Sequence, residues 1–166
     1  MSTSPTRVPK IHTSRSPNET IALGKALAAR HPEGACFYLE GDLGSGKTLL
    51  TKGIAAGYGI PDDRVVSPTF ALVNRYSGST RTLYHIDLYR LENPRELEEL
   101  GLEELGEELA GGPTGAGAVI VVEWSEKLDA LGGYRRPNAV QVRLEALEGG
   151  ARRIQILETE AAGAKT

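Results

Sequence analysis

The spacing of apolar residues divides the chain into helical and extended segments. Two short and largely apolar runs, 35–40 and 118–122, are typical of buried strands in a parallel sheet. Leucines four residues apart at 23 and 27 favour an amphipathic helix to about residue 29. Ser16-Pro17-Asn18-Glu19 supplies a cap, an early proline and a capping-box glutamate for it. The predicted strands are 8–14, 35–40, 70–76, 83–88, 118–122, 140–147 and 153–157, and the predicted helices are 17–29, 47–56 and a short acidic helix from 94.

The order of these elements predicts an α/β fold. A central, mostly parallel sheet flanked by helices, with antiparallel additions, accommodates them best. We expect residues 1–15 to form a partly disordered lead with a possible edge strand. Residues 16–159 then form one domain and 160–166 a flexible tail. The glycine-rich segment 111–117 is expected to be a flexible loop.

Composition places the chain among ordinary globular proteins. It has 166 residues, of which 40% are hydrophobic and 25% charged. No apolar run is long enough to cross a bilayer, and the first ten residues lack the apolar core of a secretory signal. The single cysteine, Cys36, excludes an internal disulfide and a cysteine-based zinc site. We therefore expect a cytoplasmic protein without a membrane partner.

Charge is unevenly distributed along the chain. The net charge is −3, but residues 92–108 hold eight acidic side chains and one basic side chain. The remainder is mildly positive. This distribution argues against a general nucleic-acid binder, which would carry a dominant basic face. A solvated helix face is the simplest interpretation of the acidic run.

One segment carries a strong chemical signal. Gly41-Asp42-Leu43-Gly44-Ser45-Gly46-Lys47-Thr48 fits the phosphate-loop pattern G-x-x-x-x-G-K-[ST] between a predicted strand and a predicted helix. The glycines allow backbone N–H groups to converge on phosphate oxygens, and the following helix adds the positive end of its dipole. Lys47 is expected to reach the β- and γ-phosphates, and the Thr48 hydroxyl to ligate Mg²⁺. The sequence therefore predicts a nucleotide site in a P-loop NTPase-like fold.

A phosphate loop needs acidic partners for metal binding and hydrolysis. Glu123 closes the apolar strand 118–122, which places it at the sheet edge where open α/β folds bind ligands. Asp87 lies on the polar face of the strand 83–88, where a surface salt bridge with an arginine is the alternative interpretation. His85 either pairs with Asp87 or is a structural histidine. Trp124 either lies near the nucleotide or packs in the core.

Together these segments resemble the TsaE (YjeE) family of bacterial ATPases. The resemblance is carried by GDLGSGKT, SPTFALVNRY, YHIDLYRL, ELEELGLEEL and VVEWSEKL, in that order. It covers roughly residues 16–157. Ser45, Leu49 and Phe70 stand where alanine, threonine and tyrosine are common in the family, and none of these changes removes a functional group that the activity needs.

The resemblance implies a role in making threonylcarbamoyladenosine in tRNA. The family supports a TsaB–TsaD-type heterodimer by hydrolysing ATP, and tRNA is reached only through that complex. It implies that residues 44–49, including Leu49, hold the phosphates, that Thr48 and Glu123 hold Mg²⁺, and that Asp87 is the second acidic residue. Thr69 then belongs to a switch-like segment, and the region around Thr20 faces the base and ribose. The residues expected to bind the nucleotide are Gly41, Gly44, Ser45, Gly46, Lys47, Thr48, Leu49 and Thr69; Thr48, Glu123 and Asp87 are the expected Mg²⁺ ligands, and Lys47, Asp87 and Glu123 the expected catalytic residues.

The mechanism expected from the residues is attack of water on the γ-phosphate. Lys47, Mg²⁺ and the loop amides stabilise the charge of the transition state, and either Asp87 or Glu123 orients the water. Two other functions stay open. A small metabolite kinase shares the phosphate loop, although an arginine-rich lid is absent from the acidic segment 92–108. A non-catalytic binding module would use the nucleotide to order residues 67–76 as a docking surface.

Overall fold

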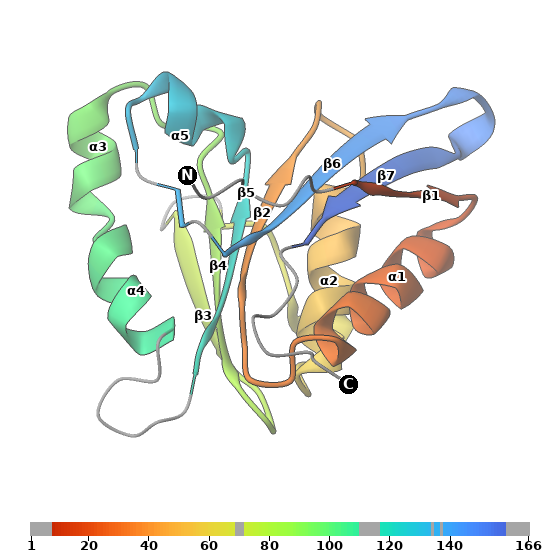
Figure 1. Cartoon of the computed structure of the whole chain (residues 1–166), viewed down its shortest axis with the longest axis horizontal. Coiled ribbons are helices and arrows are strands. Elements are labelled where there is room, and N and C mark those ends of the chain that lie inside the picture. The colour runs from red at the N-terminus through yellow and green to blue at the C-terminus, as the bar shows by residue number, and fades with distance from the viewer. Residues whose placement is uncertain (1–7, 69–71, 110–116, 134, 137, 159–166) are drawn as a thin grey trace, which may run out of the picture.

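Seven strands form one sheet in the order β1-β7-β6-β2-β5-β4-β3 (Figure 1). The computed structural model describes residues 8–68, 72–109, 117–133, 135–136 and 138–158. The strands are β1 (Lys10–Ser14), β2 (Cys36–Glu40), β3 (Val73–Ser77), β4 (Thr82–Asp87), β5 (Val119–Glu123), β6 (Val140–Ala146) and β7 (Arg152–Leu157). The α-helices are α1 (Pro17–Ala29), α2 (Lys47–Gly57), α3 (Pro94–Glu99), α4 (Leu102–Leu109) and α5 (Glu126–Ala130), and the short 3-10 turns are η1 (Asp62–Arg64) and η3 (Glu148–Gly150).

The centre of the sheet is parallel and its edges are antiparallel. Strand β2 runs parallel to both neighbours, β5 and β6, and β4 runs parallel to β5. The hairpin partner β3 and the strands β7 and β1 are antiparallel additions. This arrangement confirms the predicted α/β, P-loop NTPase-like fold class. It also brings the carboxyl ends of β2, β4 and β5 to one edge of the sheet, where such folds bind ligands.

Helices cover both faces of the sheet (Figure 1). Alternate residues of β2 point to opposite faces, as expected for a strand. Phe37 and Leu39 join the core beneath α1 and α2. Tyr38 joins the second core, which contains Leu97 of α3 and Leu128 of α5. The strand is therefore buried on both sides, which explains its nearly continuous apolar sequence.

Helices α1 and α2 pack with their backbones in close approach. A Cβ atom built on Gly53 would lie 2.1 Å from the carbonyl oxygen of Ile21, and one on Gly24 would lie 2.8 Å from the Gly53 Cα. Only glycine allows this approach without moving a helix. At the other end of α1, Ser16 caps the helix by accepting a hydrogen bond from Glu19 N, as the sequence predicts. The packing fixes the position of α2 and of the loop that precedes it.

The structure differs from the sequence expectations at a few elements. Helix α5 was not predicted, because its five residues are too few to give a periodic signal. The acidic run from residue 94 forms two helices, α3 and α4, interrupted at Gly101. The expected edge strand begins at Lys10. The termini, Thr69 and most of the predicted loop 111–117 lie outside the described residues. Within the described part of the chain, no helix is both long and apolar enough to span a bilayer.

Candidate nucleotide-binding site

The predicted phosphate loop connects β2 to α2 at the carboxyl edge of the sheet. Gly46 is the N-cap of α2 and adopts a φ of 105°, which favours glycine. The chain turns there so that the helix begins at Lys47. Below the loop, the Gly41 amide donates a hydrogen bond to Glu126 Oε2 at 3.1 Å. The loop is therefore tied to α5 as well as to the helix that it opens.

Lys47 lies almost fully buried under the loop. Its ammonium group donates hydrogen bonds to the carbonyl oxygens of Gly41 and Asp42, and it lies 4.0 Å from the centre of the Trp124 ring. Burial lowers the pKa of Lys47, and the nearby carboxylates of Glu123 and Glu126 oppose this effect. The two carbonyl oxygens and the indole ring thus fix the position of the Lys47 ammonium group.

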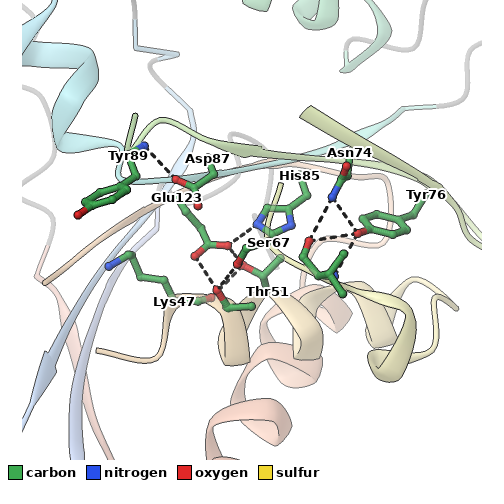
Figure 2. Close-up of polar contacts among 11 residues, drawn as sticks. Lys47, Thr51, Ser67, Asn74, Tyr76, His85, Asp87, Tyr89 and Glu123 are labelled. Atoms are coloured by element: carbon green, nitrogen blue, oxygen red, sulfur yellow. Dashed lines mark hydrogen bonds and ion pairs between the residues drawn. The ribbon is translucent and has the colours of Figure 1, made fainter. Parts of the chain in front are cut away.

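Glu123 is the hub of the polar network at the end of β5 (Figure 2). Its Oε1 accepts a hydrogen bond of 3.0 Å from the Thr48 hydroxyl. Its Oε2 contacts His85 Nε2 and accepts a longer hydrogen bond of 3.4 Å from Thr51. Glu123 is 2% exposed and His85 is fully buried. His85 therefore pairs with Glu123 and not with Asp87, which settles the alternative left open by the sequence.

This network fixes the orientation of the Glu123 carboxylate. Oε2 is occupied by two side chains of the protein, whereas Oε1 faces Thr48 at the start of α2. A carboxylate held at one oxygen presents the other in a defined direction, as outer partners do for metal ligands. The sequence could suggest that Glu123 lies at the sheet edge, but not which of its oxygens faces the loop.

Asp87 ends the neighbouring strand, β4, at the register position paired with Glu123. Its Oδ1 accepts a hydrogen bond of 2.9 Å from the Tyr89 amide. Burial raises the pKa of Asp87, the Tyr89 amide lowers it, and the nearby Glu123 carboxylate raises it. Half-burial of a carboxylate beside a second one favours its proton-bound form.

We expect Asp87→Asn to stabilise the protein at pH 7. Because the folded state raises the pKa of Asp87, it binds more protons than the unfolded chain above the ordinary pKa of 3.8, and stability falls as pH rises through that window. The side-chain amide of the variant keeps an oxygen that accepts the hydrogen bond from the Tyr89 backbone, and it removes the half-buried negative charge. Thermal unfolding should show a rise of roughly 2–4 °C at neutral pH.

The exposed Asp63 provides the control for this measurement. Asp63→Asn should leave the midpoint nearly unchanged, and the advantage of Asp87→Asn should disappear well below pH 3.8, where both states are protonated. A destabilised Asp87→Asn protein at pH 7 would contradict the prediction.

Trp124 follows Glu123 in an unusual backbone conformation. Its φ is 59°, a left-handed value that costs a non-glycine residue roughly 1–3 kcal/mol. The turn sets the indole against Lys47 and beside the Tyr89 ring, whose centre lies 4.8 Å away. Trp124 also packs against the core beneath α3 and α5. Trp124 therefore packs against the core and also lines the cavity beside the phosphate loop, and its place near a nucleotide stays a prediction.

The segment after η1 also reaches this network, where Figure 2 shows Ser67 near Glu123 and Thr51. Ser67 Oγ lies 3.0 Å from the Thr48 hydroxyl. Val66 is held by β3, because its amide donates to the Tyr76 hydroxyl and its carbonyl oxygen accepts from Asn74. The segment that the family resemblance marks as switch-like is thus connected to Thr48 through Ser67, while Thr69 lies outside the described residues.

A cavity of about 400 Å³ opens above these residues. Seven of the predicted residues line it: Gly44, Gly46, Lys47, Thr48, Leu49, Asp87 and Glu123. Gly41 and Ser45 of the loop are not among the residues that line the cavity, and Ser45 is buried. The lining consists of Leu43, Gly44, Gly46, Lys47, Thr48, Leu49, Ser67, Pro68, Leu72, Asp87, Tyr89, Arg90, Glu123, Trp124 and Arg152.

Some of these lining residues carry no signal in the sequence. Arg152 belongs to no motif and is distant from the loop in sequence, and the SPTFALVNRY segment contains Ser67 without showing that it contacts Thr48. The YHIDLYRL motif contains Tyr89 and Arg90 but does not show that they face the loop. Thr20, expected near the base, is fully buried and bonded to Ser14 Oγ at 2.7 Å, and it is not among the lining residues.

The donor set suits Mg²⁺. Oxygen atoms of Thr48 and Glu123 lie 3.0 Å apart, and Asp87 follows at the adjacent strand end. The described residues contain no cluster of three acidic, histidine or cysteine side chains that would hold a metal by themselves. Mg²⁺ is commonly bound by one or two carboxylates together with substrate phosphates, which is the arrangement that these residues permit.

Comparisons with known proteins agree with this geometry. The model of the family described as "Threonylcarbamoyl adenosine biosynthesis protein TsaE" matches residues 14–154. A tRNA threonylcarbamoyladenosine biosynthesis protein TsaE from Rickettsia conorii is 37% identical over 147 residues, which are 89% of this chain and 77% of that protein. The Bacillus subtilis protein of the same name is 44% identical over 115 residues, covering 69% of this chain and 65% of that one.

A solved structure shows the same fold. The crystal structure of Bacillus subtilis YdiB superposes with a TM-score of 0.69 at 29% sequence identity, covering 93% of this chain and 88% of that chain. The family match spans most of the described strands and includes the phosphate loop, the residues around Asp87 and the end of β5. The chain therefore belongs to the TsaE family of threonylcarbamoyladenosine biosynthesis proteins.

Proposed function

We propose that the protein is a Mg²⁺-dependent ATPase that supports the synthesis of threonylcarbamoyladenosine in tRNA. One observation carries the proposal: Lys47, Thr48, Asp87 and Glu123 converge on a single cavity above a phosphate loop. Family membership supports the pathway, because the relatives bear the name of that modification. A cytoplasmic location is consistent with a tRNA substrate of the pathway.

The residues that line the cavity have different proposed roles in ATP hydrolysis. The loop amides and Lys47 would bind the phosphates, and Thr48 and Glu123 would hold Mg²⁺. The metal, when bound, supplies positive charge that offsets the charge developing on the phosphate oxygens. Asp87 and the Glu123 carboxylate lie at adjacent strand ends, from which either can orient the attacking water. Trp124 covers the Lys47 ammonium and limits its contact with bulk water.

The proposed partner is a TsaB–TsaD-type heterodimer. The residues of the cavity provide phosphate binding and hydrolysis, but none of them identifies a site for transfer of a carbamoyl group to adenosine. We therefore propose that tRNA is reached through the heterodimer and that the chain contributes ATP turnover. Ser67 links the switch-like segment to Thr48, which gives the partner a route to sense the bound nucleotide.

Phosphate release from Mg-ATP tests the proposal. The purified chain is measured alone and with the heterodimer, at matched nucleotide concentration. We expect slow hydrolysis by the chain alone and stimulation by the partner, with no product when Mg²⁺ is chelated. ATP hydrolysis that the heterodimer does not stimulate would support the proposed ATPase activity but not the proposed role in threonylcarbamoyladenosine synthesis.

Two other outcomes would replace the proposal. Tight ATP binding without turnover in either condition would favour the non-catalytic binding module. Transfer of the phosphoryl group to an added nucleoside or sugar, instead of to water, would favour the metabolite kinase. Absence of both nucleotide binding and turnover would contradict every nucleotide function considered for this cavity.

A further inference from the structure

Arg152 is placed at the cavity by the alternation of side chains along β7. It is the first residue of this strand and pairs with Ala146 of β6 and Ser14 of β1. Ile154 and Ile156, which share its face, belong to the core beneath α1 and α2. Arg152 therefore points to the side of the sheet on which α2 and the phosphate loop lie. Arg153, its neighbour, points to the opposite face.

The Arg152 side chain lies directly against the loop. A Cβ atom built on Gly46 would lie 2.6 Å from Arg152 Nε and 2.7 Å from its Cδ. Gly46 is the N-cap of α2, where backbone N–H groups and the helix dipole already favour an anion. The contact thus adds a guanidinium to the phosphate-binding end of the helix.

Arg152 also lacks a carboxylate partner. Its Nε is buried without a hydrogen bond, and no ion pair of Arg152 occurs among the described residues. Two other arginines of the sheet are paired with carboxylates: Arg153 with Glu145 at 3.1 Å and Arg143 with Glu40 at 2.6 Å. A half-buried guanidinium without a partner is costly, and its planar fork matches phosphate geometry. The missing partner is therefore expected to be an anion that enters the cavity.

The order of the strands shows from which side Arg152 approaches. Strand β7 lies on one side of β2, whereas β5 and β4, which carry Glu123 and Asp87, lie on the other. Arg152 therefore approaches the loop from the side opposite to the proposed metal ligands. A phosphate group remote from the metal, present in both ATP and ADP, fits this position better than the γ-phosphate.

We propose that Arg152 binds the part of the phosphate chain that ATP and ADP share. This inference rests on the proposed nucleotide function of the same cavity, and it assigns the residue to binding, not to the reacting γ-phosphate. It also gives a role to the hairpin β6–η3–β7, which no sequence motif connects with the loop. The side chain supplies a charge-assisted hydrogen bond to a phosphate oxygen.

Calorimetric titration of the full chain with Mg-ATP, Mg-ADP and Mg-tripolyphosphate tests this assignment. Arg152→Ala should lower the affinity for each of the three ligands by a similar factor, about 10- to 100-fold, as expected for the loss of a charged hydrogen bond. Arg152→Lys should recover part of the loss, because the charge remains while the fork is lost. Arg153→Ala, which removes the exposed pair with Glu145, should change each affinity less than about twofold.

The three ligands separate the ways in which the assignment can fail. Unchanged affinity of Arg152→Ala, with normal binding by the wild type, overturns the inference and leaves the proposed function intact. A loss confined to ATP and tripolyphosphate, with ADP unaffected, places Arg152 at the γ-phosphate instead. A loss for ATP and ADP without one for tripolyphosphate places it at the nucleoside. If the wild type binds no ATP, the inference and the proposed function both fail. Thermal unfolding without ligand should show no loss of stability for Arg152→Ala, because the half-buried guanidinium has no carboxylate partner among the described residues to lose. A lower midpoint for this variant would mean that Arg152 serves the fold and would overturn the inference.

Discussion

Lys47→Ala is expected to reduce ATP affinity by at least about 100-fold. The Lys47 ammonium is the buried cation at the centre of the loop, where it contacts the carbonyl oxygens of Gly41 and Asp42 and the Trp124 ring. Two charge-assisted hydrogen bonds to phosphate oxygens, at roughly 1.5–3 kcal/mol each, account for a loss of this size. Calorimetric titration with Mg-ATP measures it directly, and phosphate release should fall to the level of buffer.

Lys52→Ala is the matched control for this result. Lys52 lies on the same helix, α2, but it is not among the residues that line the cavity. Its removal should change ATP affinity less than about twofold, because it takes away one positive charge without a direct contact. Near-normal ATP binding by a Lys47→Ala protein that is folded by circular dichroism would contradict the prediction. It would show that Lys47 does not contact the phosphates.

The fold could be predicted largely because its signals are local. The apolar run of β5 and the cap at Ser16 specify a buried strand and a helix start without reference to the rest of the chain. Helix α5 escaped prediction because five residues do not complete two helical turns. Its position is set by packing of Leu128 against the core and by the contact of Glu126 with the loop, and both are tertiary.

The site, like the fold, could be predicted only where its signals are local in the sequence. The phosphate-loop pattern identifies Lys47 and Thr48, because backbone geometry and residue type are encoded within eight consecutive positions. Glu123 could be suspected from its place after an apolar strand. The pairing of His85 with Glu123 could not be predicted, because it depends on β4 lying beside β5 in a particular register. Arg152 reaches Gly46 only through the hairpin of β6 and β7, which no periodicity along the chain reveals.

Glu123→Gln should abolish most of the hydrolysis while ATP still binds. The substitution keeps the volume of a side chain that is 2% exposed, but it removes the charge that would hold Mg²⁺ and orient water. An amide oriented with its oxygen toward His85 and Thr51 keeps an acceptor for both side chains, so the fold should survive. We expect phosphate release to fall at least about 100-fold and ATP affinity to fall less than about tenfold. Phosphate release and calorimetry on the same preparation separate the two effects.

Glu40→Gln controls for the loss of a glutamate at a strand end. Glu40 ends β2 as Glu123 ends β5, but its carboxylate pairs with Arg143 and does not line the cavity. This variant should keep most of its hydrolysis. If Glu123→Gln hydrolyses ATP normally while Asp87→Asn does not, the role of orienting water belongs to Asp87. In that case the function of Glu123, locked between His85 and Thr48, is to hold the end of β5 against α2, because both of its oxygens would then serve only as acceptors within the protein.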